Sequence, residues 1–428
     1  MFFVLRIYFR RIHITGLDNL SYGKPVVLAS SHSNSFNDAF VLGTMLDRSL
    51  NYLARSDVFK TALIRRIFKS FHMLPIYRIQ EGKDNVIRNL DTFGKCFEIL
   101  QNKGLVLIYA EGLCVQEKRM RPIKKGAARI AFGALENGVQ DIHIVPVGLN
   151  YTYPAKFRGE VIISIGKPIK LQELTQLYQE HPAVAYKRLG IRIGKGMMKE
   201  MIIIDDPKSE PLAERLLLMV RNHLQTPFLK WRFTSRKPLE TEQAVTNVVN
   251  SMKTEKEEEF NKLDKKTSDY FARLARFKLQ DSNIAGQSVS WVQVVLCFMM
   301  LPIIFCGYIF RYPVMMTSEF ITSRTVKSIE FYGSVFLSVG FIIYLLLLIA
   351  TCIIFTLILG WLWGLILLFA IPLIGFVNIY WEEILLKIIS LIRYKIFRKS
   401  HREETTQLKA LRMSIIRDAD LIPYTVKR

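Results

Sequence analysis

Short apolar runs alternate with helical patterns along the first 170 residues of the chain. Six runs have the length of strands, and most are rich in β-branched residues: Pro25–Ser31, Asn51–Ser56, His72–Arg78, Gly104–Gly112, Ile142–Asn150 and Val161–Gly166. Helical patterns separate several of them, over Asp57–Lys69, Lys83–Asn102 and Lys124–Asn137. This alternation predicts an α/β domain with a mixed, largely parallel sheet covered by helices. Ligands of such sheets bind where the strands end.

The stretch from Leu171 to Gln287 is more polar and favours helix. In segments such as EKEEEFNKLDKK, acidic and basic side chains recur three and four residues apart, a spacing at which they are neighbours on a helix. Charge patterns of this kind are typical of solvent-exposed helices. We therefore expect a solvated helical region, with a partner-binding coiled coil as the alternative.

Two long uncharged segments follow. Trp291–Phe310 contains twenty consecutive uncharged residues, enough to cross the hydrocarbon core of a bilayer. Phe331–Trp381 contains fifty-one, which suits two spans joined near Gly360–Gly364 as a helical hairpin. Pro302 interrupts the first segment, so that segment is either a kinked span or a re-entrant one.

These patterns divide the chain into five parts. We expect a membrane-surface leader at 1–16, because this stretch is apolar and aromatic but interrupted by arginines. The other parts are the α/β domain at 17–200, the charged helical region at 201–288, membrane segments at 289–381 (291–310, 333–358 and 362–380) and a basic cytosolic tail at 382–428.

Charge and cysteine content narrow the partners and the compartment. The net charge of +22 favours an anionic partner, and the apolar segments make a bilayer with anionic lipids the simplest one. No zinc-finger spacing, ribonucleoprotein aromatic signature or basic zipper is present, so we expect no nucleic-acid partner. The five cysteines include no C-x-x-C pair, which indicates reduced thiols facing a cytosolic compartment.

The flanks of the apolar segments predict the membrane topology. The stretch before Trp291 adjoins the region with reduced cysteines, and the tail from Lys387 onward is strongly basic, so we expect both on the cytosolic side. Two cytosolic ends require an even number of crossings, and the simplest solution makes Trp291–Phe310 a dip into the near leaflet. We expect an integral membrane protein, of the bacterial inner-membrane kind, with the α/β domain and the C-terminus cytosolic.

A histidine and an aspartate stand six residues apart directly after the first apolar run. If the strand ends at Ser31 and a helix begins around Ser35, His32 lies at the positive end of that helix, where the neutral imidazole is favoured. Asp38 would then hold the ring in one tautomer, so that His32 acts as a base. The helix N-terminus near Ser33–Ser35 would help to stabilise an oxyanion. The alternative is a structural histidine with a capping aspartate.

A second group of polar residues follows a later apolar run. Glu111 and Gly112 end that run, and Lys118, Arg119, Arg121, Lys124 and Lys125 precede Gly126, which opens a helix. A helix N-terminus approached by several cations is suited to bind a phosphate. The alternative is a solvated basic loop. Arg78 ends another run, and the seven histidines show no metal-ligand spacing, so we expect no metal site.

Four pieces in this order resemble the signature of the glycerolipid acyltransferase family, whose members acylate glycerol 3-phosphate and lysophosphatidate. The pieces are HSNSFND (32–38), MLPIYR (73–78), YAEG (109–112) and IVPVGLNY (144–151). Two further stretches, ARSDVFK (54–60) and IKKGAARIA (123–131), add to the resemblance, which covers about Leu17 to Lys170. The ordered set is specific, although no single piece is.

The chain departs from the common family pattern at three places. Five residues separate His32 from Asp38 instead of the usual four, which resembles one branch of the family but leaves Asn37 as an alternative partner. Ser31 precedes the histidine where Asn is usual. Leu113 and Cys114 replace the common Thr/Arg pair, so we expect the phosphate contacts of this loop to come from Arg119, Arg121 or Lys125.

The resemblance implies an O-acyltransferase that needs no cofactor beyond its co-substrate. His32, oriented by Asp38, would deprotonate a hydroxyl of the acceptor, which attacks an acyl thioester, either acyl-CoA or an acyl carrier protein. Arg78 and the loop around Lys125 would hold the phosphate of glycerol 3-phosphate or lysophosphatidate. Glu111 would either organise this site or bind an acceptor hydroxyl. Alternatives are another lysophospholipid or an amino-acid lipid as acceptor, and a non-catalytic lipid-binding protein.

Overall fold

The structure is a computed structural model that describes residues 2–77, 87–222 and 232–425. The chain forms two compact units. The sheet unit comprises residues 1–203, 231–239 and 329–334, and the helical unit comprises 204–230, 240–328 and 335–428. Each unit therefore contains segments that are far apart in the sequence.

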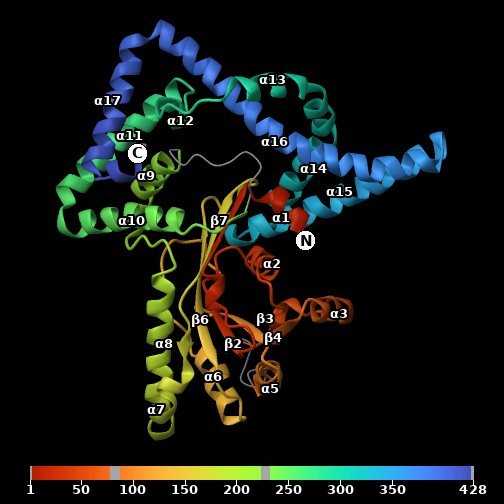
Figure 1. The fold of residues 1–428 in the computed structure, drawn as a ribbon, viewed down its shortest axis with the longest axis vertical. Coiled ribbons are helices and arrows are strands. Elements are labelled where there is room, and N and C mark those ends of the chain that lie inside the picture. Colours follow the sequence, from red (N-terminus) through yellow and green to blue (C-terminus); the bar gives the residue numbers. More distant parts are fainter. Residues whose placement is uncertain (1, 78–86, 223–231, 426–428) are drawn as a thin grey trace. The chain divides into compact units, whose positions relative to one another are not determined.

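The sheet unit is built on one sheet with the order β4-β3-β5-β2-β6-β7-β1-β9, with β8 pairing to β6 outside this path (Figure 1). The strands are β1 (Arg11–Thr15), β2 (Val26–Ser30), β3 (Leu50–Arg55), β4 (Met73–Ile76), β5 (Leu105–Tyr109), β6 (His143–Tyr151), β7 (Glu160–Ile165), β8 (Ile169–Lys170) and β9 (Arg232–Phe233). The six predicted strands are β2 to β7, and the expectation of a mixed, largely parallel sheet is confirmed.

Parallel pairing brings the carboxyl ends of the central strands to one edge of the sheet. Ser30 of β2 lies opposite both Tyr109 of β5 and Val147 of β6. On the other side of β5, β3 pairs in parallel with β4, where Arg55 lies opposite Ile76. The residues that follow β2, β3, β4 and β5 therefore gather at this edge, which is where ligand chemistry is expected in such sheets.

Helices α5 (Asn89–Gln101), α6 (Gly126–Glu136) and α8 (Pro182–Met198) bury one face of the sheet. Alternate strand residues such as Val27, Ala29 and Val106 share a core with Leu100, Phe132 and Ile193 of these helices. The stretch predicted as one helix over Asp57–Lys69 divides into a 3-10 turn (Ser56–Val58) and α3 (Ala62–Ser70). The division occurs because Thr61 caps α3, its side chain accepting a hydrogen bond from the Ile64 amide.

The N-terminal residues belong in part to the sheet, which differs from the expected leader at 1–16. Helix α1 (Phe2–Tyr8) is followed by β1, which pairs with β7 and β9. Ile12 and Ile14 are fully buried. Their alternation with polar neighbours is a strand pattern, and the arginines around them concealed it in the sequence.

The helical unit has its own core, formed with residues of α9 (Glu210–Arg221), α10 (Lys237–Glu255), α11 (Glu257–Arg276) and α17 (Arg402–Asp418). Arg412 and Asp281 form a buried ion pair within it, with Nε 2.7 Å from Oδ1. The hydroxyl of Tyr270 donates to the same carboxylate at 2.7 Å. The expected helical region is therefore folded around a core, and α12 (Asp281–Ile284) supplies one of its central charges.

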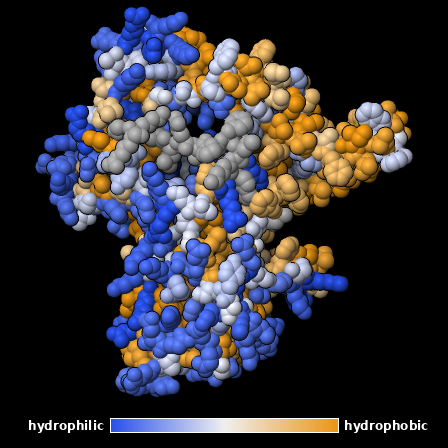
Figure 2. Space-filling model, in the orientation of Figure 1, coloured by the Kyte–Doolittle hydropathy of each residue, from blue (hydrophilic) through white to orange (hydrophobic). Residues whose placement is uncertain are grey.

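The apolar segments form four helices. Helices α13 (Trp291–Met299) and α14 (Leu301–Thr325) meet at a bend of 61°, next to Pro302. Helices α15 (Ile329–Leu359) and α16 (Trp361–Ser400) are each long and apolar enough to cross a membrane, and the chain breaks between them at Gly360, as expected. Figure 2 shows that the surface over α15 is almost continuously apolar. Helix α16 continues through the expected start of the tail at 382.

Candidate active site

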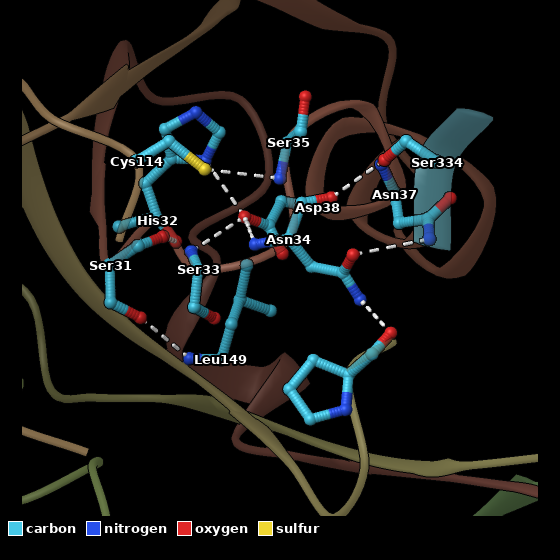
Figure 3. Close-up of polar contacts among 12 residues, drawn as sticks. Ser31, His32, Ser33, Asn34, Ser35, Asn37, Asp38, Cys114, Leu149 and Ser334 are labelled. Carbon is cyan, nitrogen blue, oxygen red and sulfur yellow. Dashed lines mark hydrogen bonds and ion pairs between the residues drawn. The ribbon is translucent and has the colours of Figure 1, made fainter. Parts of the chain in front are cut away.

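His32 lies just beyond the carboxyl end of β2 and before α2 (Phe36–Met45), as the sequence predicted. Its Nδ1 atom is 2.8 Å from Oδ2 of Asp38, which lies in the first turn of α2 (Figure 3). The Asp38 side chain is completely buried, and the His32 side chain retains 18% of its exposure. The pair therefore has one enclosed partner and one that solvent or a ligand can reach.

Asp38 accepts four hydrogen bonds. The backbone amides of Ser33 and Asn34 both donate to Oδ2 at 2.9 Å, and the hydroxyl of Tyr151 donates to Oδ1 at 2.6 Å. Because the carboxylate acts as an acceptor in all of these contacts, the fourth bond requires His32 to donate from Nδ1. Neutral His32 then carries a lone pair on Nε2, the form in which it can take a proton.

Asn37 lies on the same helical turn but makes different contacts. Its side-chain amide donates to Oδ1 of Asn34 at 3.3 Å, and its backbone amide donates to the hydroxyl of Ser334 at 3.1 Å. Figure 3 shows these contacts on the far side of Asp38 from the imidazole. Of the two partners left open by the five-residue spacer, Asp38 is the one that contacts His32.

The prediction that the backbone amides of Ser33–Ser35 stabilise an oxyanion is wrong. Those of Ser33 and Asn34 are committed to Asp38, and that of Ser35 donates to the sulfur of Cys114 at 3.2 Å. An amide already bonded within the protein is not preorganised for a new anion. The helix N-terminus here organises the aspartate instead.

Tyr109, the last residue of β5, stacks on the imidazole. The two ring centroids are 3.6 Å apart and the ring planes differ by 12°. Burial, and secondarily the charge of Asp38, raises the pKa of the Tyr109 hydroxyl well above its ordinary value. The stack and the Asp38 bond together fix the position of the His32 ring, which is what a base needs before it can act.

The residues after Tyr109 cross back over the His32 turn. Gly112 has φ = +70°, a conformation that strongly favours glycine, and its amide donates to the Tyr109 carbonyl at 3.0 Å. The Val115 amide then donates to the His32 carbonyl at 3.1 Å. Cys114, which replaces the usual family residue, contributes the acceptor for Ser35. The loop after Tyr109 thus holds the His32 turn in place through these hydrogen bonds.

Glu111 is buried, with 6% of its surface exposed. Its Oε2 accepts a hydrogen bond from the Arg121 backbone amide at 3.1 Å. Burial raises the pKa of Glu111 to about 7, although the Arg121 amide and charge act in the opposite direction. Of the two roles left open for Glu111, this contact supports the one in which Glu111 organises the site, because it closes the loop between residues 111 and 121.

The two arginines of the basic loop share one carboxylate. Arg119 and Arg121 lie 3.1 and 2.9 Å from Oε2 of Glu117. Partial burial raises the pKa of Glu117, but the hydrogen bonds and charges of both arginines outweigh it and lower the pKa below its usual range. The structure therefore brings Arg119 and Arg121 together. Because they share one carboxylate, the three side chains keep a net positive charge.

Lys125 is exposed directly before the first residue of α6. The Lys124 amide donates to the Ala110 carbonyl at 2.8 Å, which ties the start of α6 to the end of β5. The expected approach of a lysine to a helix N-terminus is thus present. Arg78, the other predicted phosphate ligand, lies outside the described residues.

Four residues of this site were not singled out from the sequence. Tyr109 and Tyr151 end strands in YAEG and GLNY, and this strand-end position was their only signal. Arg55 ends β3 at the same sheet edge and pairs with Asp57. Cys114 had no signal beyond its departure from the family pattern. Within ranges 2–77, 87–222 and 232–425, no group of three His, Cys, Asp or Glu residues is placed to hold a metal ion.

The site residues lie in a part of the chain that is similar to known proteins. Residues 11–150 match the family model described as Acyltransferase. The chain is 32% identical over 105 residues to glycerol-3-phosphate O-acyltransferase 2 of Saccharomyces cerevisiae, covering 24% of this chain and 14% of that protein. It is 28% identical over 167 residues to the chloroplastic 1-acyl-sn-glycerol-3-phosphate acyltransferase LPAT1 of Arabidopsis thaliana, covering 38% of this chain and 44% of that protein.

The chain thus spans less than half the length of these curated relatives. The crystal structure of the 1-acyl-sn-glycerophosphate acyltransferase PlsC from Thermotoga maritima matches with a TM-score of 0.34 and 14% identity, covering 46% of this chain and 74% of that chain. The family match contains β1 to β5, nearly all of β6 and the His32–Asp38 pair. The similarity to the acyltransferase family therefore covers residues 11–150, the part of the chain that holds the His32–Asp38 pair.

Proposed function

We propose that the protein is a membrane-bound O-acyltransferase that moves a fatty acyl group from an acyl thioester to a hydroxyl of glycerol 3-phosphate or lysophosphatidate. The observation that carries this proposal is the His32–Asp38 contact at 2.8 Å, in which Nε2 of His32 is left to take a proton. The names of the relatives support both acceptors, since one acylates glycerol 3-phosphate and the other its 1-acyl derivative.

The reaction proceeds by general base catalysis. Nε2 of His32 removes the proton of the acceptor hydroxyl as the hydroxyl oxygen attacks the thioester carbonyl. The tetrahedral intermediate collapses, the carbon–sulfur bond breaks, and the imidazolium returns its proton to the thiolate that leaves. Asp38 stabilises the imidazolium through Nδ1 and is held by Ser33, Asn34 and Tyr151. No acyl-enzyme is needed.

The phosphate of the acceptor binds the cations at the same sheet edge. Lys125, at the N-terminus of α6, supplies a positive charge where backbone amides also favour an anion. Arg119 and Arg121 add guanidinium groups, and Arg78 is the remaining candidate from the sequence. Binding the phosphate fixes the acceptor hydroxyl against His32, which lowers the entropic cost of the reaction.

The apolar helices anchor this site at an anionic, cytosolic membrane face. Helix α15 begins in the sheet unit, since residues 329–334 belong to that unit. Helix α16 ends among the residues of the soluble helical core, because Tyr394 and Phe397 pack there. If α15 and α16 each cross the membrane once, the hairpin leaves and returns on one side of it.

Helices α13 and α14 do not cross the membrane in this proposal. Two crossings by α15 and α16 would put both ends of the α13–α14 pair on the cytosolic side. The 61° bend then marks a re-entrant pair. An ion pair supports this arrangement: Arg311 of α14 contacts Glu382, the first charged residue of α16. A paired charge of this kind is expected near the interface.

The test is acyl transfer by the purified protein in detergent. Radiolabelled acyl-CoA and acyl carrier protein are each offered with glycerol 3-phosphate, lysophosphatidate, other lysophospholipids and an amino-acid lipid. We expect product with one of the first two acceptors, and His32→Ala to lower kcat by on the order of 10³-fold. If only another acceptor gives product, that acceptor is the substrate in place of the two proposed here. No transfer to any acceptor would favour a lipid-binding role.

A further inference from the structure

The first turns of α15 contact the loop that carries His32 and Asp38. Ser334 of α15 is 1% exposed. Its hydroxyl accepts from the Asn37 amide at 3.1 Å and donates to the Asn34 carbonyl at 2.9 Å (Figure 3). Ser334 belongs to the sheet unit although 297 residues separate it from Asn37. A single hydroxyl thus joins both ends of the short segment from residue 34 to residue 37.

This segment determines where Asp38 lies. The Asn34 amide donates to the Asp38 carboxylate, and Asn37 directly precedes Asp38 in α2. Between them Ser35 has φ = 46° and ψ = −126°, an unusual conformation for a residue other than glycine. Strained backbone of this kind persists only where surrounding contacts impose it. Ser334 supplies two of those contacts.

The adjacent glycine allows α15 to come this close. A Cβ atom on Gly333 would lie 2.7 Å from the Pro154 carbonyl oxygen and 3.1 Å from Oδ1 of Asn34. The side chain of Asn34 also donates to the Pro154 carbonyl at 3.0 Å. Gly333 and Ser334 therefore fit α15 against the His32 loop and the segment after β6 together.

We propose that Ser334 is a positioning residue, through which the first turns of the membrane helix α15 hold the His32–Asp38 loop in its reactive geometry. Ser334 acts on the His32–Asp38 pair through its hydrogen bonds to Asn34 and Asn37. The helix that anchors the protein in the bilayer thus also completes the catalytic loop. This inference rests on the proposed acyltransferase function for its kinetic readout, but the contacts themselves do not depend on it.

The experiment compares Ser334→Ala, Ser334→Thr and Ser323→Ala in the full chain in lipid nanodiscs. Ser323 is the matched control, because its exposed hydroxyl donates only within its own helix, to the Phe320 carbonyl. We expect Ser334→Ala to lower kcat by about 10-fold while KM for both substrates stays within about twofold. Ser334→Thr, which keeps the hydroxyl, should recover most of kcat, and Ser323→Ala should match the parent protein.

Deuterium uptake of the peptide that contains residues 33–38 is measured on the same samples. We expect faster uptake in Ser334→Ala than in the parent protein and Ser323→Ala, because the Asn37 amide loses one acceptor. If Ser334→Ala is not recovered folded, Ser334→Cys replaces it, since a thiol is a weak partner of similar size. Unchanged uptake, or a kcat within about twofold of the parent protein, would overturn the proposal.

The two readouts separate this inference from the proposed function. If the parent protein transfers no acyl group while Ser334→Ala still loosens the 33–38 peptide, the proposed function fails and the contact between α15 and the loop stands. If acyl transfer is present but neither readout responds to Ser334→Ala, the proposed function stands and the role of Ser334 fails.

Discussion

Asp38 contacts Nδ1 of His32 at 2.8 Å, whereas its neighbour Asn37 directs its side-chain amide to Asn34. One residue of spacing therefore decides which side chain orients the imidazole. Asp38 is held by three further donors from Ser33, Asn34 and Tyr151, so its position does not depend on the histidine alone.

Asp38→Asn should be far more damaging than Asn37→Ala. The asparagine amide would present a donor to His32 and favour the wrong tautomer, so we expect kcat to fall by on the order of 10²- to 10⁴-fold. Asn37→Ala removes one long hydrogen bond within the loop, and we expect a fall of roughly 5-fold. Steady-state acyl transfer measures both, and a larger loss for Asn37→Ala would assign the partner role to Asn37.

Tyr151→Phe should lower kcat without changing KM. The Tyr151 hydroxyl is a buried donor to Oδ1 of Asp38, and a hydrogen bond to a charged group contributes about 1.5–3 kcal/mol. We expect kcat to fall by on the order of 10-fold. Tyr178→Phe is the control, because its hydroxyl bonds Glu136 away from His32. Equal kcat for the parent protein and Tyr151→Phe would show that the Tyr151 hydroxyl does not contribute to catalysis.

The local part of this site was predictable from the sequence, and the distant part was not. His32 and Asp38 are six residues apart, so a strand followed by a helix was sufficient to bring them together. Tyr151 reaches Asp38 across 113 residues, and no pattern near either residue specifies that pairing. Ser334 is still more distant in the sequence, within an apolar segment whose pattern did not indicate contact with the His32–Asp38 loop.

The same distinction holds for the fold. Strands β2 to β7 were predictable because each is a distinct apolar run between turn residues. Strands β8 and β9 have two residues each, too few to form a pattern. Strand β1 was missed because the arginines at its start suggested a membrane-surface leader, whereas Ile12 and Ile14 are buried in a strand that pairs with β7, far along the chain.

Glu111→Gln should remove a pH dependence of stability. The ordinary pKa of this carboxyl is 4.5, and burial raises it to about 7 in the folded protein. Between these values the folded state holds a proton that the unfolded state releases, so stability falls as pH rises from about 4.5 to 7, by on the order of 3 kcal/mol. Glutamine resembles the protonated carboxyl and does not titrate.

Thermal unfolding of both proteins from pH 5 to pH 8 measures this difference. We expect similar melting temperatures at pH 5 and a higher melting temperature for Glu111→Gln at pH 8. The amide oxygen of glutamine can still accept from the Arg121 backbone, so the loop contact is kept. Parallel pH profiles for the two proteins would show that Glu111 ionises as an ordinary carboxyl.

Arg412→Met should destabilise the helical unit strongly. Arg412 and Asp281 are both almost completely buried, and removing one partner leaves an uncompensated charge. We expect the free energy of unfolding to fall by about 3–5 kcal/mol. Arg417→Met, on the exposed side of the same helix, should change it by less than about 0.5 kcal/mol. Denaturant unfolding followed by circular dichroism compares the two, and similar losses would contradict the role of the ion pair.

Single cysteines should show that α13 and α14 begin and end on the same side of the membrane. Ser288, before α13, and Lys327, after α14, are exposed, and Trp361 lies at the turn between α15 and α16. In oriented vesicles of a cysteine-free background, we expect a membrane-impermeant maleimide to label Ser288→Cys and Lys327→Cys from one side and Trp361→Cys only from the other. Labelling of Ser288→Cys and Lys327→Cys from opposite sides would mean that the bent pair crosses the bilayer. The pairing of Arg311 with Glu382 would then place both charges away from the interface, where an ion pair is costly.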